Sequence, residues 1–98
     1  MLYLASFTWK PGLTRQQTDA ALGRRAQYKF PAGFEWVAEY WPAGPTIVVV
    51  VFEAANYAPV MQFLIDWDDV FDVVVYPTTT PEEGLKLGAE AIQRRPAA

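Results

Sequence analysis

The chain has 98 residues, a formal net charge of −3, a hydrophobic fraction of 52%, and neither cysteine nor histidine. Its length fits a single domain, which we expect to span residues 1–98. The missing residue types exclude disulfides, thiolate nucleophiles, histidine-ligated haem and a Ser-His-Asp triad formed by this chain. Its acidic balance argues against nucleic acid as a partner.

The hydropathy pattern argues against a membrane partner. The longest apolar run, Ile47–Phe52, is far shorter than the roughly 20 residues that cross a bilayer. The first residues also lack the basic segment that opens a signal peptide. We therefore expect a cytoplasmic protein.

The first two elements are a strand and a helix. Residues Leu2–Trp9 are rich in aromatic side chains, and a turn containing proline and glycine follows at 10–12. Thr14 is the expected N-cap of a helix from about Arg15 to Tyr28, with Gln17 as its capping-box partner.

Two strands and a second helix come next. Phe34–Trp41 and Thr46–Glu53 read as strands, because both are rich in aromatic or β-branched residues and a turn with two prolines separates them at 42–45. Asn56 is placed to cap a second helix, whose apolar residues recur every three or four positions up to Trp67.

A fourth strand and a last helix complete the order. Phe71–Tyr76 alternates as a strand does, and Thr80, Pro81 and Glu83 form a helix start for a segment ending near Arg94. The order βαββαβ plus a C-terminal helix predicts an α+β, ferredoxin-like fold. Its four-stranded antiparallel sheet would carry two helices on one face.

The second face of that sheet is too apolar to face water. Leu2 and Leu4 alternate with Tyr3 and Ala5, and the third strand is apolar on both sides. An uncovered face of this kind would be a large exposed patch. We expect a second copy to cover it, giving a homodimer built as a dimeric α/β barrel of about eight strands. The alternative is a monomer in which the C-terminal helix covers this face.

Several short segments carry a resemblance to a known family. They are FTWKPG at 7–12, PAGF at 31–34, EA at 53–54, WDD at 67–69 and FDVVVYP at 71–77. Together they resemble the DUF3303 family of small bacterial proteins, over residues 1 to about 92. The resemblance implies the ferredoxin-like dimeric α/β-barrel fold and a homodimer, and it brings no catalytic residues. The turn at 42–45 departs from the family by being shorter and stiffer.

The wider dimeric-barrel superfamily suggests function classes. It includes cofactor-free monooxygenases, haem-degrading enzymes, lactone isomerases and amino-acid sensors, and the lack of histidine disfavours its haem-binding members. The resemblance thus implies binding of a small apolar or aromatic ligand without a cofactor, by an oxygenase, isomerase or cyclase. The alternative is a non-catalytic binding or assembly module whose aromatic residues serve only packing.

Six residues are the candidates for such a site. Two tryptophans would wall the ligand, a tyrosine would donate a proton, an asparagine would hold a carbonyl, and a second tyrosine and an arginine would make further ligand contacts. In that order they are Trp36, Trp67, Tyr40, Asn56, Tyr28 and Arg24. Regular alternation places Trp36 and Tyr40 on one strand face, and Asn56 also fits a purely structural role as a helix cap.

The acidic residues are given structural interpretations. The run D-W-D-D-V-F-D at 66–72 reads as a solvated helix end, because it lacks the glycine and closing glutamate of a calcium loop. Glu35 and Glu39 would share a strand face about 13 Å apart and be exposed on an edge strand. No metal site is expected.

Overall fold

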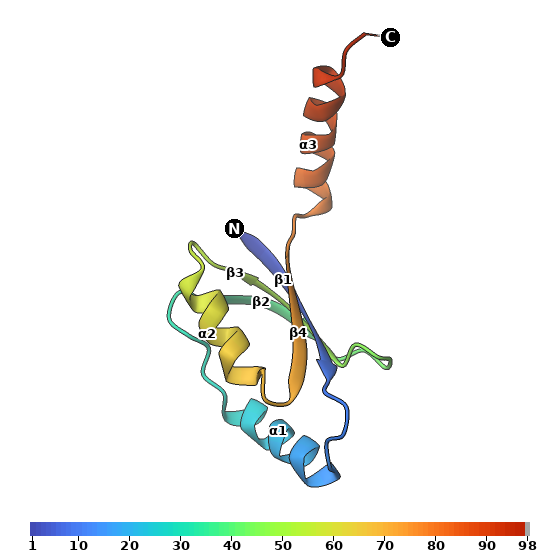
Figure 1. The fold of residues 1–98 in the computed structure, drawn as a ribbon. Helices are drawn as coiled ribbons and strands as arrows, with labels where there is room; N and C mark the ends of the chain where they lie inside the picture. Colours follow the sequence, from blue (N-terminus) through green and yellow to red (C-terminus); the bar gives the residue numbers. More distant parts are fainter. Residues whose placement is uncertain (98) are drawn as a thin grey trace.

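One antiparallel sheet forms the centre of the molecule. The computed structural model describes residues 1–97. Strands β1 (Leu2–Trp9), β2 (Glu35–Tyr40), β3 (Val48–Glu53) and β4 (Phe71–Pro77) lie in the order β2-β3-β1-β4. All three neighbouring pairs are antiparallel. With the helices between them, the strands make the predicted α+β ferredoxin-like topology (Figure 1).

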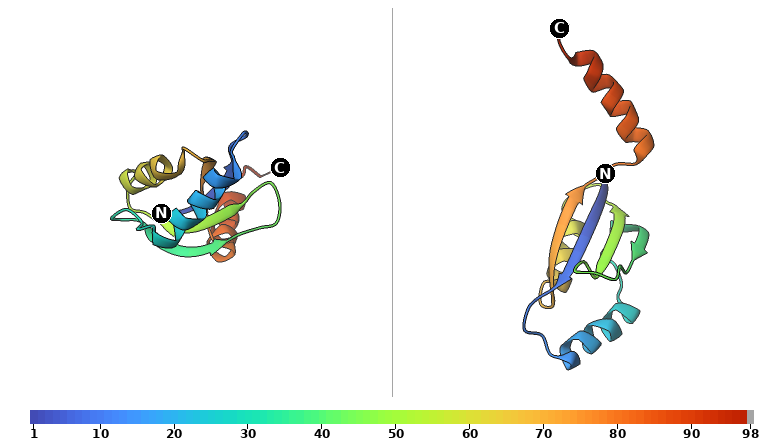
Figure 2. Two further views of the ribbon diagram at one scale, coloured as in Figure 1. Left: turned by 90° about the horizontal axis from the view of Figure 1, so that it is seen from below. Right: turned by 90° about the vertical axis from the view of Figure 1, so that its right-hand side faces the viewer.

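The three helices occupy different positions around this sheet. Helix α2 (Ala58–Trp67) lies over one face, here called the inner face, and α1 (Arg15–Gln27) lies beyond the end of the sheet at which β1 ends. Helix α3 (Pro81–Arg94) leaves the opposite end and points away from the sheet (Figure 2). None of the helices within residues 1–97 is long and apolar enough to cross a bilayer.

Two helix starts have the predicted capping geometry. The Thr14 hydroxyl accepts the Gln17 N–H at 3.2 Å, and the Gln17 side chain accepts the Thr14 N–H at 2.8 Å. At α3, the Thr80 hydroxyl accepts the Glu83 N–H at 3.2 Å, and Pro81 occupies the first helical turn. These bonds satisfy N–H groups that have no partner inside a helix.

The core lies between the inner face and α2 and is largely aromatic. Phe52 of β3 and Phe63 of α2 are fully buried. Phe34 stacks on Phe52 with ring centroids 4.1 Å apart and packs against Phe63 at 4.7 Å. Phe7 meets Phe63 edge-on at 5.5 Å. Much of the aromatic content of the chain therefore fills this core.

A β-bulge changes which β2 side chains share a face. Trp36 pairs with Phe52 and Ala38 pairs with Val51, so Val37 is the extra residue. Downstream of the bulge, Glu39 lies opposite Val50 on the inner face and Tyr40 lies on the outer face. The expectation that Trp36 and Tyr40 share a face, and that Glu39 lies with Glu35, is therefore wrong.

The centre of the outer face is apolar and no helix covers it (Figure 2, right). The strand registers set two complete rows of side chains across it, between Glu35 and Glu53 at one end and Thr8 and Asp72 at the other. One row is Ala38, Val51, Leu4 and Tyr76, and the other is Tyr40, Val49, Ser6 and Val74. Helix α3, which the monomer alternative placed over this face, does not cover it in the single chain.

Candidate functional site

A cleft lies between the inner face, α1 and α2. The strands β1, β3 and β4 contribute Phe7, Trp9, Val48, Val50 and Phe71, the helices contribute Ala21, Leu22, Arg25, Phe63 and Trp67, and β2 and the connecting segments contribute Tyr28, Phe30, Glu39, Trp41 and Ile47. The cleft is open on one side, and its open volume is about 70 Å³. Leu22 and Trp41 are half exposed and lie at its mouth.

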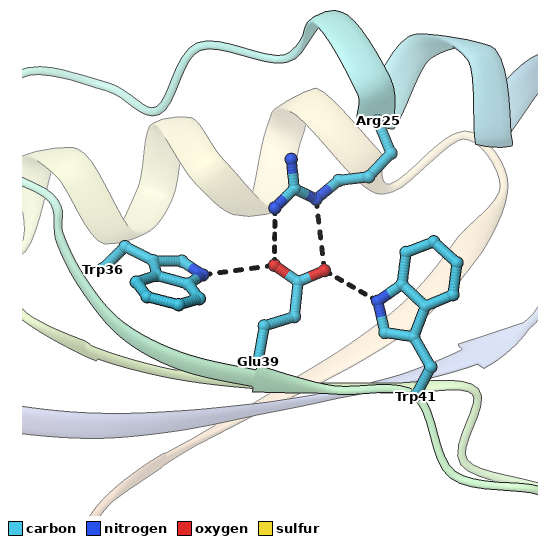
Figure 3. Close-up of polar contacts among 4 residues, drawn as sticks. All are labelled: Arg25, Trp36, Glu39 and Trp41. Atoms are coloured by element: carbon cyan, nitrogen blue, oxygen red, sulfur yellow. Dashed lines mark hydrogen bonds and ion pairs between the residues drawn. The ribbon is translucent and has the colours of Figure 1, made fainter.

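A carboxylate with four hydrogen-bond donors closes the β2 side of this cleft (Figure 3). Arg25 reaches across from α1 and donates to both Glu39 oxygens, at 2.6 Å and 3.2 Å. The indole N–H groups of Trp36 and Trp41 donate to the same carboxylate at 3.2 Å and 2.7 Å. The Glu39 side chain is only 8% exposed, so the expectation of an exposed edge residue is wrong. We call this group the Glu39 cluster.

The Glu39 cluster holds its carboxylate ionised. Burial raises the pKa of Glu39, but the hydrogen bonds from Arg25, Trp41 and Trp36 together outweigh burial, and the pKa lies below its ordinary value. A carboxylate with a lowered pKa and four donors is a poor proton acceptor. Its role in this geometry is to fasten α1 to β2.

Tyr28 and Trp67 form the wall of the cleft near α2. Their rings meet edge-on with centroids 5.2 Å apart. The Tyr28 hydroxyl donates to Asp66 at 2.7 Å, and burial together with this bond raises the pKa of the phenol. The phenol therefore stays protonated at neutral pH, with its proton held by Asp66 rather than directed at the cleft.

Arg24 supports the wall from outside the cleft. Its guanidinium lies over the Trp67 ring, 4.5 Å from the centroid, and donates two hydrogen bonds to Asp69 at 3.0 Å and 3.2 Å. This pairing lowers the pKa of Asp69. Arg24 does not line the cleft. Its charge is matched by Asp69, and its contact with the ring supports the position of Trp67.

The structure therefore brings together only some of the predicted site residues. Tyr28 and Trp67 line the cleft, whereas Trp36 and Arg24 contact residues that do. Tyr40 lies on the outer face and is 67% exposed.

Asn56 lies one residue before the N-cap of α2, which is Tyr57, so the predicted cap position is wrong by one residue. Its side chain accepts the Ala58 N–H at 3.1 Å, so its carbonyl oxygen is bonded to the helix start. It does not line the cleft.

Arg25, Glu39 and Leu22 were not among the six predicted site residues. The available signal for Glu39 was a glutamate followed directly by two aromatic residues, Tyr40 and Trp41. The bulge that turns this residue inward has no glycine to mark it.

The acidic run at 66–72, from the end of α2 to the start of β4, is partly paired to basic and phenolic groups from other elements. Asp66 accepts the Tyr28 hydroxyl, Asp69 binds Arg24, and Asp72 binds Lys10 at 2.8 Å. Three carboxylates at this helix end thus have partners, and the interpretation of a merely solvated run is incomplete. Within residues 1–97, no three acidic residues gather as metal ligands would.

The cleft is suited to binding an apolar group. Among residues 1–97, no buried side-chain nitrogen or oxygen lacks a hydrogen-bond partner. Arg25 and the Trp41 indole are bonded to Glu39, and the Tyr28 hydroxyl is bonded to Asp66, which leaves mainly carbon surface for a guest. Ligand sites generally combine such a surface with a few polar groups.

A family model described as Domain of unknown function (DUF3303) matches residues 1–92. The chain belongs to the DUF3303 family. No curated protein and no solved structure matches this DUF3303 chain. The family match extends into α3, so that helix is part of the DUF3303 domain.

Proposed function

We propose that this DUF3303 protein is a homodimer that binds a small apolar or aromatic molecule in the cleft between its inner sheet face, α1 and α2. The observation that carries the binding proposal is the cleft itself, an aromatic cavity with a paired polar group at its side. The wall formed by Trp67 and Tyr28 offers ring surfaces for a planar guest.

The geometry favours binding over catalysis by a cofactor-free oxygenase, isomerase or cyclase. Such an enzyme needs a base or proton donor within hydrogen-bond reach of its substrate. Glu39 is held ionised by four donors, and the proton of Tyr28 is directed at Asp66. A non-catalytic binding module needs neither a free base nor a free proton donor, so it is compatible with these residues.

The size of the cleft limits its ligand. An open volume of about 70 Å³ is well below the roughly 300–1,000 Å³ of drug-sized sites. The ligand would be a single ring or short alkyl group that enters the cleft, with any larger part left at the mouth near Leu22 and Trp41.

The outer face supports the homodimer. Its two rows are apolar apart from Ser6, and Val74 and Tyr76 are about half exposed in one copy. An isologous pairing of two such faces would bury the same patch on both chains.

The ligand proposal is tested by titrating ¹⁵N-labelled protein with indole and following amide shifts by NMR. We expect saturable shifts confined to residues around the cleft. Leu22→Trp, which fills the mouth, should weaken indole binding at least tenfold. Ile65→Trp is the matched control, because Ile65 is an exposed aliphatic residue of α2 outside the cleft. Shifts scattered over the surface, or equal binding by both variants, would refute a site in the cleft.

A further inference from the structure

Helix α3 has an apolar side that nothing in its own chain covers. Its six polar residues fall within about a third of the helix circumference at 100° per residue. They are Glu82, Glu83, Lys86, Glu90, Gln93 and Arg94. The remaining surface carries Leu85, Leu87 and Ile92, which are 76%, 50% and 62% exposed. No residue of α3 is buried.

The position of α3 explains this exposure. A three-residue linker, 78–80, leads from β4 to α3, and the helix then runs away from the sheet (Figure 1). The Cα radius of gyration is 16.9 Å, whereas a compact chain of this length has one of about 12.6 Å. The molecule measures 60 Å along its longest axis and 18 Å along its shortest.

We propose that the apolar side of α3 packs against a second copy of this chain, so that each chain extends α3 as an arm onto its partner. The inference deepens the proposed homodimer and rests on it. It assigns the two uncovered apolar surfaces of one chain, the outer face and α3, to a single two-fold assembly.

The area needed by a stable dimer favours this arrangement. From strand spacing and rise, the two apolar rows of the outer face have a footprint of about 300 Å². Specific interfaces bury about 800 Å² on each partner. The 14 residues of α3 span about 21 Å and add a strip about 10 Å wide. The arm therefore supplies contact area that the sheets alone lack.

A glycine on the apolar side fits a close neighbour. Gly88 costs about 1 kcal/mol relative to alanine inside a helix. Apart from its two neighbours and the backbone of α3 itself, nothing in residues 1–97 lies within 4 Å of the position that a Cβ there would take. The chain's own packing gives no reason for this glycine, whereas a helix or sheet of a second copy approaching there does.

The polar side of α3 argues against two other positions. A helix inserted between the two sheets would be apolar all round, and α3 is not. A helix lying on an anionic lipid surface carries mainly lysine and arginine on its polar side. The polar side of α3 instead carries three glutamates and only two basic residues.

The inference is tested with two neighbouring substitutions on α3. Ile92→Glu places a charge on the apolar side, and Gln93→Glu places the same charge on the polar side. Light scattering on the full chain should give about 22 kDa for the wild type, twice the 11.0 kDa of one chain. Ile92→Glu should raise the dimer dissociation constant at least tenfold, and Gln93→Glu should leave it unchanged. Near-UV circular dichroism checks the core, which contains no α3 residue.

A second measurement adds no charge to the proposed interface. The chain has no cysteine, so single variants Ile92→Cys and Gln93→Cys can be labelled selectively. A thiol reagent should modify Ile92→Cys at least tenfold more slowly than Gln93→Cys, and dilution below the dissociation constant should remove the difference.

Each outcome decides between the two proposals. A wild-type dimer that Ile92→Glu leaves intact, or equal labelling of both cysteines, overturns the α3 arm and leaves the sheet-mediated dimer standing. Slow labelling of Ile92→Cys that persists on dilution shows α3 folded onto its own chain and also overturns the arm. A wild-type mass near 11 kDa overturns the homodimer and the arm together.

Discussion

Glu39 shows how a single side chain can join two elements. Its carboxylate lies on an edge strand, yet it is nearly buried because Arg25 and two tryptophans surround it. A buried charge is tolerated only where its hydrogen bonds replace water. Four donors make that replacement here, which is why β2 can carry an acid on its inner face.

Glu39→Gln should destabilise the protein by about 1–3 kcal/mol, because it leaves a half-buried guanidinium without its counter-charge and points an amide N–H₂ at other donors. Urea denaturation followed by tryptophan fluorescence measures the change. Glu35→Gln is the control on the same strand, where the side chain is exposed, and it should change stability by less than about 0.5 kcal/mol. Equal effects of the two substitutions would contradict the role of the Glu39 cluster.

The lowered pKa of Glu39 also predicts a pH dependence. In the folded state, the Glu39 carboxyl stays ionised at pH values below the pKa of a glutamate in the unfolded chain, which is near 4.3. The stabilisation is therefore complete above that pH and is lost as pH falls through the folded pKa. Between pH 5 and 3, the unfolding free energy of the wild type should fall more steeply than that of Glu39→Gln. Parallel curves would argue against this linkage.

At the scale of elements, α1 and α2 are held by different forces. Helix α2 buries Pro59, Val60, Phe63 and Trp67, whereas α1 buries only Ala21. Helix α1 is instead fastened by ion pairs from its last turn, to Asp69 and to the Glu39 cluster. The exposed pair between Arg24 and Asp69 is weakened by salt, whereas apolar burial is not.

We expect α1 to open before α2. In hydrogen exchange followed by mass spectrometry, amides in 15–27 should exchange faster than those in 58–67, and 1 M NaCl should widen the gap. Thr14→Ala removes the N-cap, at a cost of about 1 kcal/mol, and should accelerate exchange in α1. Thr80→Ala, the same change at α3, should leave α1 unaffected. Slower exchange in α1 than in α2 would contradict this account.

The same elements show what the sequence could predict. The caps at Thr14 and Thr80 depend on residues three positions apart, so local pattern was enough to place both helix starts. The bulge at Val37 depends on pairing with β3, which no local pattern reveals. That one inserted residue separates Trp36 from Tyr40 and turns Glu39 inward. Of the four expected aromatic site residues, Tyr40 is the one that the bulge turns to the outer face.

At the scale of the whole molecule, one chain leaves two apolar surfaces exposed, and they differ in how far their residues are buried. The outer face is a sheet surface with a mixture of half-buried and exposed residues, and α3 is an isolated amphipathic helix. Helices of this length are marginal in water without a packed partner. The folded state of α3 and the assembly state are therefore expected to be linked.

A dimer predicts that thermal stability depends on concentration. The melting temperature should rise by about 3–5 °C for each tenfold increase in protein concentration. Val74→Lys, on the outer face, should remove this dependence, whereas Ile65→Lys on the opposite side should keep it. Val74 and Ile65 are both about half exposed in one chain, so neither substitution disturbs the core directly. A melting temperature independent of concentration in the wild type would contradict the dimer.

The Glu39 cluster has a spectroscopic consequence. Two of the four tryptophans in the chain donate their indole protons to one carboxylate, and that carboxylate is held from α1. Indole N–H resonances move downfield when they donate to a charged acceptor and return when the bond breaks. Trp36 and Trp41 are thus natural, label-free reporters of whether α1 is docked. A one-dimensional proton spectrum could follow the mouth of the cleft as salt, pH or a guest molecule changes.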